Sequence, residues 1–250
     1  MHAEPDRTIS YSGGEPDFSR RLRNPRIRYI DNAGDRTRDN IASARYRRYH
    51  SCCTCADSGD AEIGKPSIPK KPQVAVLEAV DFAQAKNLHM QALIRSGAKP
   101  LALTEVGYYM DVQNAQFIQQ LRATDIDIRH EGDLIVLTLP GGDSFDPNST
   151  RLKPGAIRNL ALTAQVLTEY AQTQITIHGH TDDTGEAKYN QWLSVRRALS
   201  VTDQLLKAGV ATRRIAVVGF GENSPLVPNT TADGRARNRR IELYLEPIAR

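Results

Sequence analysis

The stretch IHGHTDDTGEAKYNQWLSVRRA, which runs from Ile177 to Ala198, carries the strongest signals for the fold of this 250-residue chain. It continues an alternation of apolar and polar residues that begins at residue 174 and is typical of a β-strand. A polar turn follows, and residues 186–208 have the apolar spacing of an amphipathic helix that Gly209 ends. The stretch therefore predicts a strand that leads through a short polar loop into a long helix.

Polar residues with complementary charges lie around this transition. Asp182 and Thr181 come just after the strand and just before the helix, whose first-turn N–H groups lack partners and favour negative charge. Asn190 and Arg197 are two helical turns apart and therefore share a face of the helix. A carboxylate that faces a guanidinium can hold both charges of an amino acid head group. From local sequence alone, the alternative is that Asp182 only caps the helix.

The elements on either side follow from the same periodicity. Residues 126–139 alternate around the turn HEGD and predict a β-hairpin, with a buried strand at 134–140. Residues 152–173 predict a helix with Pro154 in its first turn, where a missing N–H does no harm. The last two strands are expected at 214–220 and 239–245. The order β-α-β-α-β-β predicts an α/β fold, a two-layer sandwich in which helices cover one face of a mixed sheet.

Two further segments precede this expected domain. Residues 73–94 and 104–123 show near-helical spacing of apolar residues, with the breaker SGAKP between them. Residues 1–72 are rich in Arg, Asp, Ser, Gly and Pro, so burial there cannot offset the entropy lost on ordering. The sequence therefore predicts a disordered polar leader at 1–72, a helical pair at 73–124 and an α/β domain at 125–250.

The excess positive charge belongs to the leader. Residues 1–72 hold 14 Lys and Arg against 10 Asp and Glu, which accounts for the formal net charge of +4, whereas residues 73–250 hold 19 of each. A neutral domain without a continuous basic stripe argues against nucleic-acid binding. The alternative is that arginine-rich tracts of the leader, such as RYRR at 45–48, contact RNA or anionic lipid.

The three cysteines, Cys52, Cys53 and Cys55, also lie in the leader. Their spacing fits neither a disulfide framework nor the paired ligands of a zinc site. The residues before Cys52, ARYRRYHS, are too polar for the hydrophobic region of a lipoprotein signal, and no run of about 20 apolar residues predicts a transmembrane helix. An export signal is not readable, and the mature N-terminus and lipidation stay open.

Four motifs in order resemble a known family. They are GHTDDTG (179–185), YNQWLSVRRA (189–198), GFGENSP (219–225) and GRARNRRIEL (234–243). They resemble the OmpA-like C-terminal domain, the peptidoglycan-binding domain of OmpA, Pal and MotB type, over roughly 130–247. The resemblance independently implies the two-layer α/β fold. It also implies a protein of the periplasm, associated with the outer membrane, that tethers an envelope component to the cell wall.

The resemblance assigns roles to particular residues. Asp182 and Arg197 match the positions that in the family hold the diaminopimelate of the peptidoglycan stem peptide. Arg239 is the next implied contact, although alternation along a strand prevents all four arginines of GRARNRR from serving one site. Asp146, in a Phe-Asp dipeptide, either caps a turn or lines the site. Peptidoglycan is the expected partner, with other envelope proteins expected through the helices at 73–124. Muropeptide preference and oligomeric state stay open.

A metal-dependent envelope hydrolase is the alternative from a different class. His178, His180 and Asp182 form an HxHxD pattern, which on a strand would place all three side chains on one face and could hold a metal ion. No fourth ligand or water-activating glutamate stands at readable spacing, and there is no serine elbow, phosphate loop or dinucleotide fingerprint. The sequence therefore favours a non-catalytic binding module without a metal or cofactor.

Overall fold

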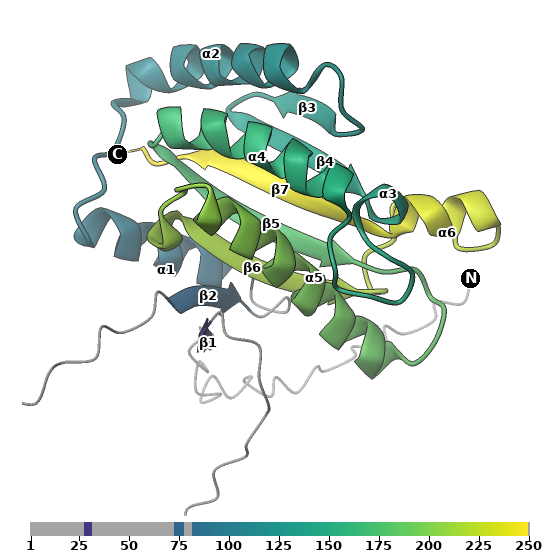
Figure 1. The fold of residues 1–250 in the computed structure, drawn as a ribbon. Coiled ribbons are helices and arrows are strands. Elements are labelled where there is room, and N and C mark those ends of the chain that lie inside the picture. Colours follow the sequence, from purple (N-terminus) through teal and green to yellow (C-terminus); the bar gives the residue numbers. More distant parts are fainter. Residues whose placement is uncertain (1–27, 32–72, 78–81, 250) are drawn as a thin grey trace, which may run out of the picture.

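A mixed seven-stranded sheet forms the centre of the structure, a computed structural model that describes residues 28–31, 73–77 and 82–249 (Figure 1). The strands are β1 (Arg28–Asp31), β2 (Gln73–Leu77), β3 (Asp127–Glu131), β4 (Leu134–Pro140), β5 (Thr173–His180), β6 (Ile215–Gly221) and β7 (Arg240–Pro247). Their order across the sheet is β1-β2-β6-β5-β7-β4-β3. β2 and β5 run parallel to β6, and the other neighbouring pairs are antiparallel.

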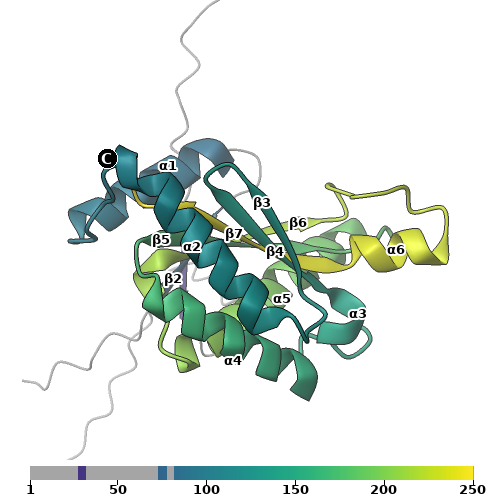
Figure 2. The same cartoon turned by 90° about the horizontal axis from the view of Figure 1, so that it is seen from above.

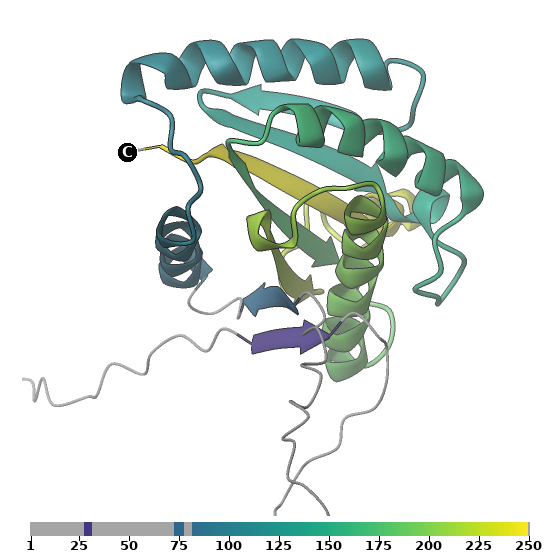
Figure 3. The same ribbon diagram turned by 60° about the vertical axis from the view of Figure 1, so that its left-hand side comes forward.

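Helices pack on both faces of this sheet. They are α1 (Phe82–Arg95), α2 (Leu103–Leu121), α3 (Gly141–Ser144), α4 (Pro154–Glu169), α5 (Ala187–Lys207), the 3-10 helix η1 (Thr212–Arg214) and α6 (Ala232–Asn238). α4 and α5 lie side by side on one face, and α2 runs along α4 above β3 and β4 (Figures 1 and 2). α1 covers the opposite face near β2 and β6 (Figure 3). None of the described helices has the length and apolar character needed to cross a bilayer.

The expected order β-α-β-α-β-β and the mixed sheet are confirmed between β4 and β7. The hairpin, both long helices and the last strands begin and end within a few residues of their predicted bounds. Alternation along β6 explains the core, because Ile215 and Val217 join the large cluster under α4 and α5, whereas Ala216 and Val218 face α1. The helix predicted at 104–123 is α2, whose buried side chains belong to the same large core.

The helix predicted from residue 73 is wrong at its start. Residues 73–77 form β2, which pairs with β6, and the helix begins only at Phe82. The run VAVL is apolar on both faces, and Val74, Ala75 and Leu77 are buried. A short continuous apolar run of this kind fits a strand inside a sheet as well as a helix. α1, which belongs to the segment before the expected domain, lies on the opposite face, whereas α4 and α5 lie on one face as expected.

Two further differences concern segments expected to be irregular or extended. Arg28–Asp31, within the predicted disordered leader, forms β1 and pairs with β2. The remainder of the leader, including Cys52, Cys53 and Cys55, lies outside the described residues. The motif GRARNRR is largely helical, because Thr231 caps α6 by accepting a hydrogen bond from the Gly234 N–H at 3.0 Å.

Two glycines let α5 lie directly on the sheet. Gly179 of β5 and Gly219 of β6 are paired neighbours in the sheet. A Cβ at Gly179 would overlap the backbone carbonyl of Ser194, and one at Gly219 would overlap the side chains of Ser194 and Val195. The Ser194 hydroxyl accepts a hydrogen bond from the Gly221 N–H at 3.1 Å and thus also joins helix to sheet. The absence of two side chains therefore sets the height of α5 above β5.

We expect Gly179→Ala to destabilise the protein by about 1–3 kcal/mol or more, because the added methyl group meets backbone that cannot move independently. Gly107→Ala is the matched control, since a methyl group added at Gly107 of α2 would have no neighbouring atom within 4 Å. The control should be neutral or more stable by up to about 1 kcal/mol. Urea unfolding measures both, and a Gly179→Ala protein as stable as the control would contradict this packing.

Candidate functional site

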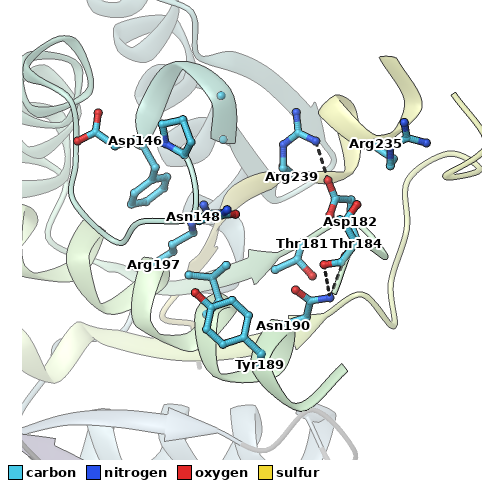
Figure 4. Close-up of a pocket in the computed structure, with 15 residues that line it drawn as sticks. Asp146, Asn148, Thr181, Asp182, Thr184, Tyr189, Asn190, Arg197, Arg235 and Arg239 are labelled. Atoms are coloured by element: carbon cyan, nitrogen blue, oxygen red, sulfur yellow. Dashed lines mark hydrogen bonds and ion pairs between the residues drawn. The ribbon is translucent and has the colours of Figure 1, made fainter. Parts of the chain in front are cut away.

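A cavity of about 360 Å³ lies where β5 ends and α5 begins. It is bounded by residues from the loop after β4, the β5–α5 loop, α5 and α6 (Figure 4). The lining residues are Gly141, Gly142, Phe145, Asp146, Pro147, Asn148, Thr181, Asp182, Thr184, Tyr189, Asn190, Leu193, Arg197, Arg235 and Arg239. All six residues nominated from the sequence, Asp146, Thr181, Asp182, Asn190, Arg197 and Arg239, are therefore brought together around one space.

Asp182 is only 7% exposed, and both of its carboxylate oxygens accept hydrogen bonds. Oδ1 accepts from the Thr184 N–H at 3.1 Å, which stabilises the turn before α5. Oδ2 accepts from Arg239 Nη1 at 2.6 Å in an ion pair (Figure 4). The Arg239 side chain remains 37% exposed, so this pair borders the open side of the cavity.

Arg197 is a buried cation without a carboxylate partner. It is 6% exposed, and within the described residues no carboxylate oxygen lies within 4.0 Å of it. Its Nε donates to the Ser149 carbonyl at 3.0 Å, and its guanidinium lies over the Phe145 ring at 5.2 Å. Burial lowers the pKa of Arg197, and the neighbouring charge of Arg239 lowers it further. The site therefore favours an acidic ligand group beside this guanidinium.

Asn190 and Thr181 shape the loop between strand and helix. The Asn190 amide donates to the carbonyls of Asp182 and Thr184, at 3.4 and 3.2 Å, and to Glu222 Oε2 at 2.7 Å. The Thr181 N–H donates to the Gly221 carbonyl at 2.9 Å. The buried Thr181 hydroxyl has no hydrogen-bond partner in the described structure. Asn190 therefore fixes the loop, whereas the Thr181 hydroxyl is a buried polar group that the described structure leaves without a partner.

The structure changes the pairing expected of the charged residues. Asp182 forms its ion pair with Arg239 instead of Arg197, although all three line the same cavity. Arg239 reaches Asp182 because it precedes β7, the antiparallel neighbour of β5, and its carbonyl accepts from the Gly141 N–H at 2.7 Å. Asp146 lies at the rim with its carboxylate directed away from Asp182 (Figure 4).

Several lining residues were not identified from the sequence. Arg235 was expected only to precede the last strand, but it lies on α6 and donates to the Asn229 carbonyl at 2.8 Å. Asn148 has a positive φ of 50°, a conformation that asparagine adopts more readily than most residues. Tyr189 belongs to the motif YNQWLSVRRA, but no spacing or charge pattern assigns it a role. The dipeptide Pro147-Asn148 is a turn signal that indicates such a loop but not its position in space.

Comparisons with known proteins establish the family. The sequence pattern described as the OmpA family matches residues 144–239. The chain is 37% identical over 199 residues to the probable lipoprotein YiaD of Escherichia coli (strain K12), a match that covers 79% of this chain and 91% of that protein. The chain therefore belongs to the OmpA family.

Two further matches cover the C-terminal part. The chain is 39% identical over 105 residues to the peptidoglycan-binding protein ArfA of Mycobacterium tuberculosis (strain ATCC 25618 / H37Rv), which is 42% of this chain and 32% of ArfA. This chain thus spans about a third of that relative. The crystal structure of a putative MotB-like protein from Desulfovibrio vulgaris aligns with a TM-score of 0.50 and 30% identity, over 56% of this chain and 94% of that one. The two proteins therefore share the α/β fold.

The histidines of β5 belong to a different cluster, on the face of the sheet that α1 covers. His178 and His180 lie with Glu242 of β7, and their potential ligand atoms are within 4.8 Å of one another. Asp182 is not a member, because the chain leaves the strand after His180 and Asp182 lines the cavity. The proposed HxHxD grouping is therefore wrong in its third residue.

The packing around this cluster is that of a buried polar network. Glu242 accepts hydrogen bonds from Arg240 Nε at 3.0 Å and from the Tyr244 hydroxyl at 3.1 Å. Burial alone would raise the pKa of Glu242, but His180, whose Nε2 lies 3.3 Å from Glu242 Oε2, and the Arg240 charge lower it to about 2. The His178 ring stacks on Tyr244 at 4.2 Å, and burial lowers the pKa of His178 to about 3. The Glu242 carboxylate is thus already hydrogen-bonded within the fold.

This network should make the fold sensitive to mild acid. Because the pKa of folded His178 is about 3, against 6.5 in the unfolded chain, the unfolded state alone takes up the proton below pH 6.5. Stability should therefore fall as the pH drops from about 6.5 toward 3, by about 2 kcal/mol at pH 5 from this residue. Unfolding of wild type and His178→Phe between pH 8 and 5 measures this, and the variant should lose correspondingly less. If the stability of the two proteins fell equally with decreasing pH, His178 would not be the source of the acid sensitivity.

Proposed function

We propose that this protein binds peptidoglycan noncovalently through the cavity at the end of β5, and that the diaminopimelate of the stem peptide is the group held. The observation that carries the proposal is the buried Arg197 guanidinium, which faces this cavity without a carboxylate partner in the described structure. Removing a cation from water is costly, so such a group is suited to an acidic ligand that compensates it. The similarity to ArfA, a peptidoglycan-binding protein, supports this choice of ligand.

The two charged groups on the terminal carbon of a diaminopimelate side chain match the two charged parts of the cavity. Its carboxylate would accept hydrogen bonds from the terminal nitrogens of Arg197, whereas its ammonium would donate to Asp182. Arg239, which now pairs with Asp182, has an exposed side chain and can move to share that carboxylate with the ligand. A cavity of about 360 Å³ is near the lower end of the range for small-molecule sites, which suits one diamino acid.

The wider role that follows is the tethering of an envelope component to the cell wall, in the periplasm and in association with the outer membrane. The family membership and the similarity to a probable lipoprotein support this location. Residues 125–250 would be the binding domain. The exposed apolar side chains of α2, Leu103, Tyr108 and Ile118, would offer a surface to other envelope proteins.

Asp182→Ala and Arg197→Ala should each weaken binding to isolated sacculi and to a diaminopimelate tripeptide muropeptide. Removing one member of a buried charge pair costs about 2–5 kcal/mol, so an affinity loss of about 30-fold or more is expected. Arg196→Ala is the matched control, because Arg196 neighbours Arg197 on the same helix but does not line the cavity. Sacculus pull-down and calorimetry measure the effect, with circular dichroism to verify folding. If both site variants bound sacculi as strongly as the wild type, the proposed binding site would be wrong.

The identity of the diamino acid is tested separately. Wild-type protein should bind a stem peptide with diaminopimelate more tightly than the same peptide with lysine, which lacks the second carboxylate. Arg197→Ala should lose most of this preference, because Arg197 is the group proposed to bind that carboxylate. Equal wild-type affinity for the two peptides would limit the function to peptidoglycan binding without recognition of diaminopimelate.

A further inference from the structure

Two aromatic side chains on the first turns of α5 lie exposed beside the cavity. The rings of Tyr189 and Trp192 stack with centroids 5.6 Å apart and an interplanar angle of 30°. Tyr189 is 45% exposed and Trp192 is 51% exposed. Tyr189 also lines the cavity, so the aromatic surface is continuous with the proposed binding site. Trp192 is the single tryptophan of the whole chain.

The position of this pair is not explained by the packing of the fold. α5 buries Ser194 against the sheet and Arg197 in the wall of the cavity, whereas Tyr189 and Trp192 are about half exposed. Contiguous exposed apolar surface is unfavourable in water unless it contacts another molecule. The stacked rings hold each other in place, so a contact with their exposed parts costs little side-chain entropy.

We infer that the Tyr189–Trp192 pair is a platform for a sugar ring of the glycan strand. This inference rests on the proposed function, and it names a second part of the same ligand. The stem peptide is attached to a sugar, and only two residues separate that sugar from the diaminopimelate, a reach of roughly 10 Å in extended chain. One face of a pyranose ring carries C–H groups, whose slight positive charge suits the negative face of an aromatic ring.

The alternatives among exposed apolar residues are weaker. Leu103, Tyr108 and Ile118 of α2 also expose large side chains, but none lines the cavity, and nothing in the described structure indicates what covers them. The Tyr189–Trp192 pair, by contrast, adjoins the cavity, so a group that is covalently joined to the cavity ligand can reach it. The sugar of the muropeptide is such a group.

Two probes separate the sugar from the peptide: a disaccharide tripeptide muropeptide and the free tripeptide stem. Trp192→Ala should weaken binding to the muropeptide by roughly threefold to tenfold, from the usual energy of an aromatic contact, and leave binding to the free stem unchanged. Trp192→Phe should restore most of the affinity. Tyr108→Ala, on the distant surface of α2, should behave as wild type with both probes.

Fluorescence gives a second readout in the unmodified protein. Because Trp192 is the sole tryptophan, its emission should change when the muropeptide binds and change much less when the free stem binds. Equal loss of affinity for both probes in Trp192→Ala, or no loss for either, would overturn the inference. So would self-association of wild type that Trp192→Ala abolishes, since a second copy would then be the occupant. Failure of the wild type to bind the free stem would instead count against the proposed function.

Discussion

The direct contact between α5 and the β5–β6 pair is the constraint on which the binding site depends. Gly179 and Gly219 lack the side chains that would hold the helix away, and the backbone at Ser194 occupies that space. Arg197 and Asn190 project from this same helix, so their height above the sheet is set by two missing methyl groups. A shift of α5 outward would separate Arg197 from the Asp182 side of the cavity, and ligand contacts are sensitive to displacements of about 1 Å.

The charge balance of the cavity then follows from what the helix brings to it. Three guanidinium groups, those of Arg197, Arg235 and Arg239, line it together with the carboxylates of Asp146 and Asp182. Asp182 is satisfied by Arg239 and by a backbone N–H, while within the described residues Arg197 contacts the Ser149 carbonyl and the Phe145 ring and has no carboxylate partner. The fold thus keeps one buried cation incompletely compensated. The proposed ligand carboxylate would compensate it.

Sequence periodicity predicted the strand, loop and helix around Asp182 because each depends on neighbours in the chain. It also placed Asn190 and Arg197 on one helical face, as the structure does. The Asp182–Arg239 ion pair could not be predicted, because it spans 57 residues and depends on β7 lying next to β5. The strand at 73–77 was missed for a related reason, since a short apolar run becomes a strand only when a sheet edge accepts it.

The two faces of β5 explain why the segment before the α/β domain packs against it. Alternation along the strand directs Ile177 toward α4 and α5, whereas His178 and His180 face the other side. Burial keeps these imidazoles neutral beside an ionised Glu242, and Phe82 of α1 contributes to it by packing edge-on against His178 at 5.0 Å. Lys86 then joins the helix to β7 through an ion pair with Glu246 at 2.7 Å. β2 and α1 therefore cover the polar face of the sheet that β5 and β7 would otherwise expose. The cavity lies beyond the end of β5, and no residue of β2 or α1 lines it.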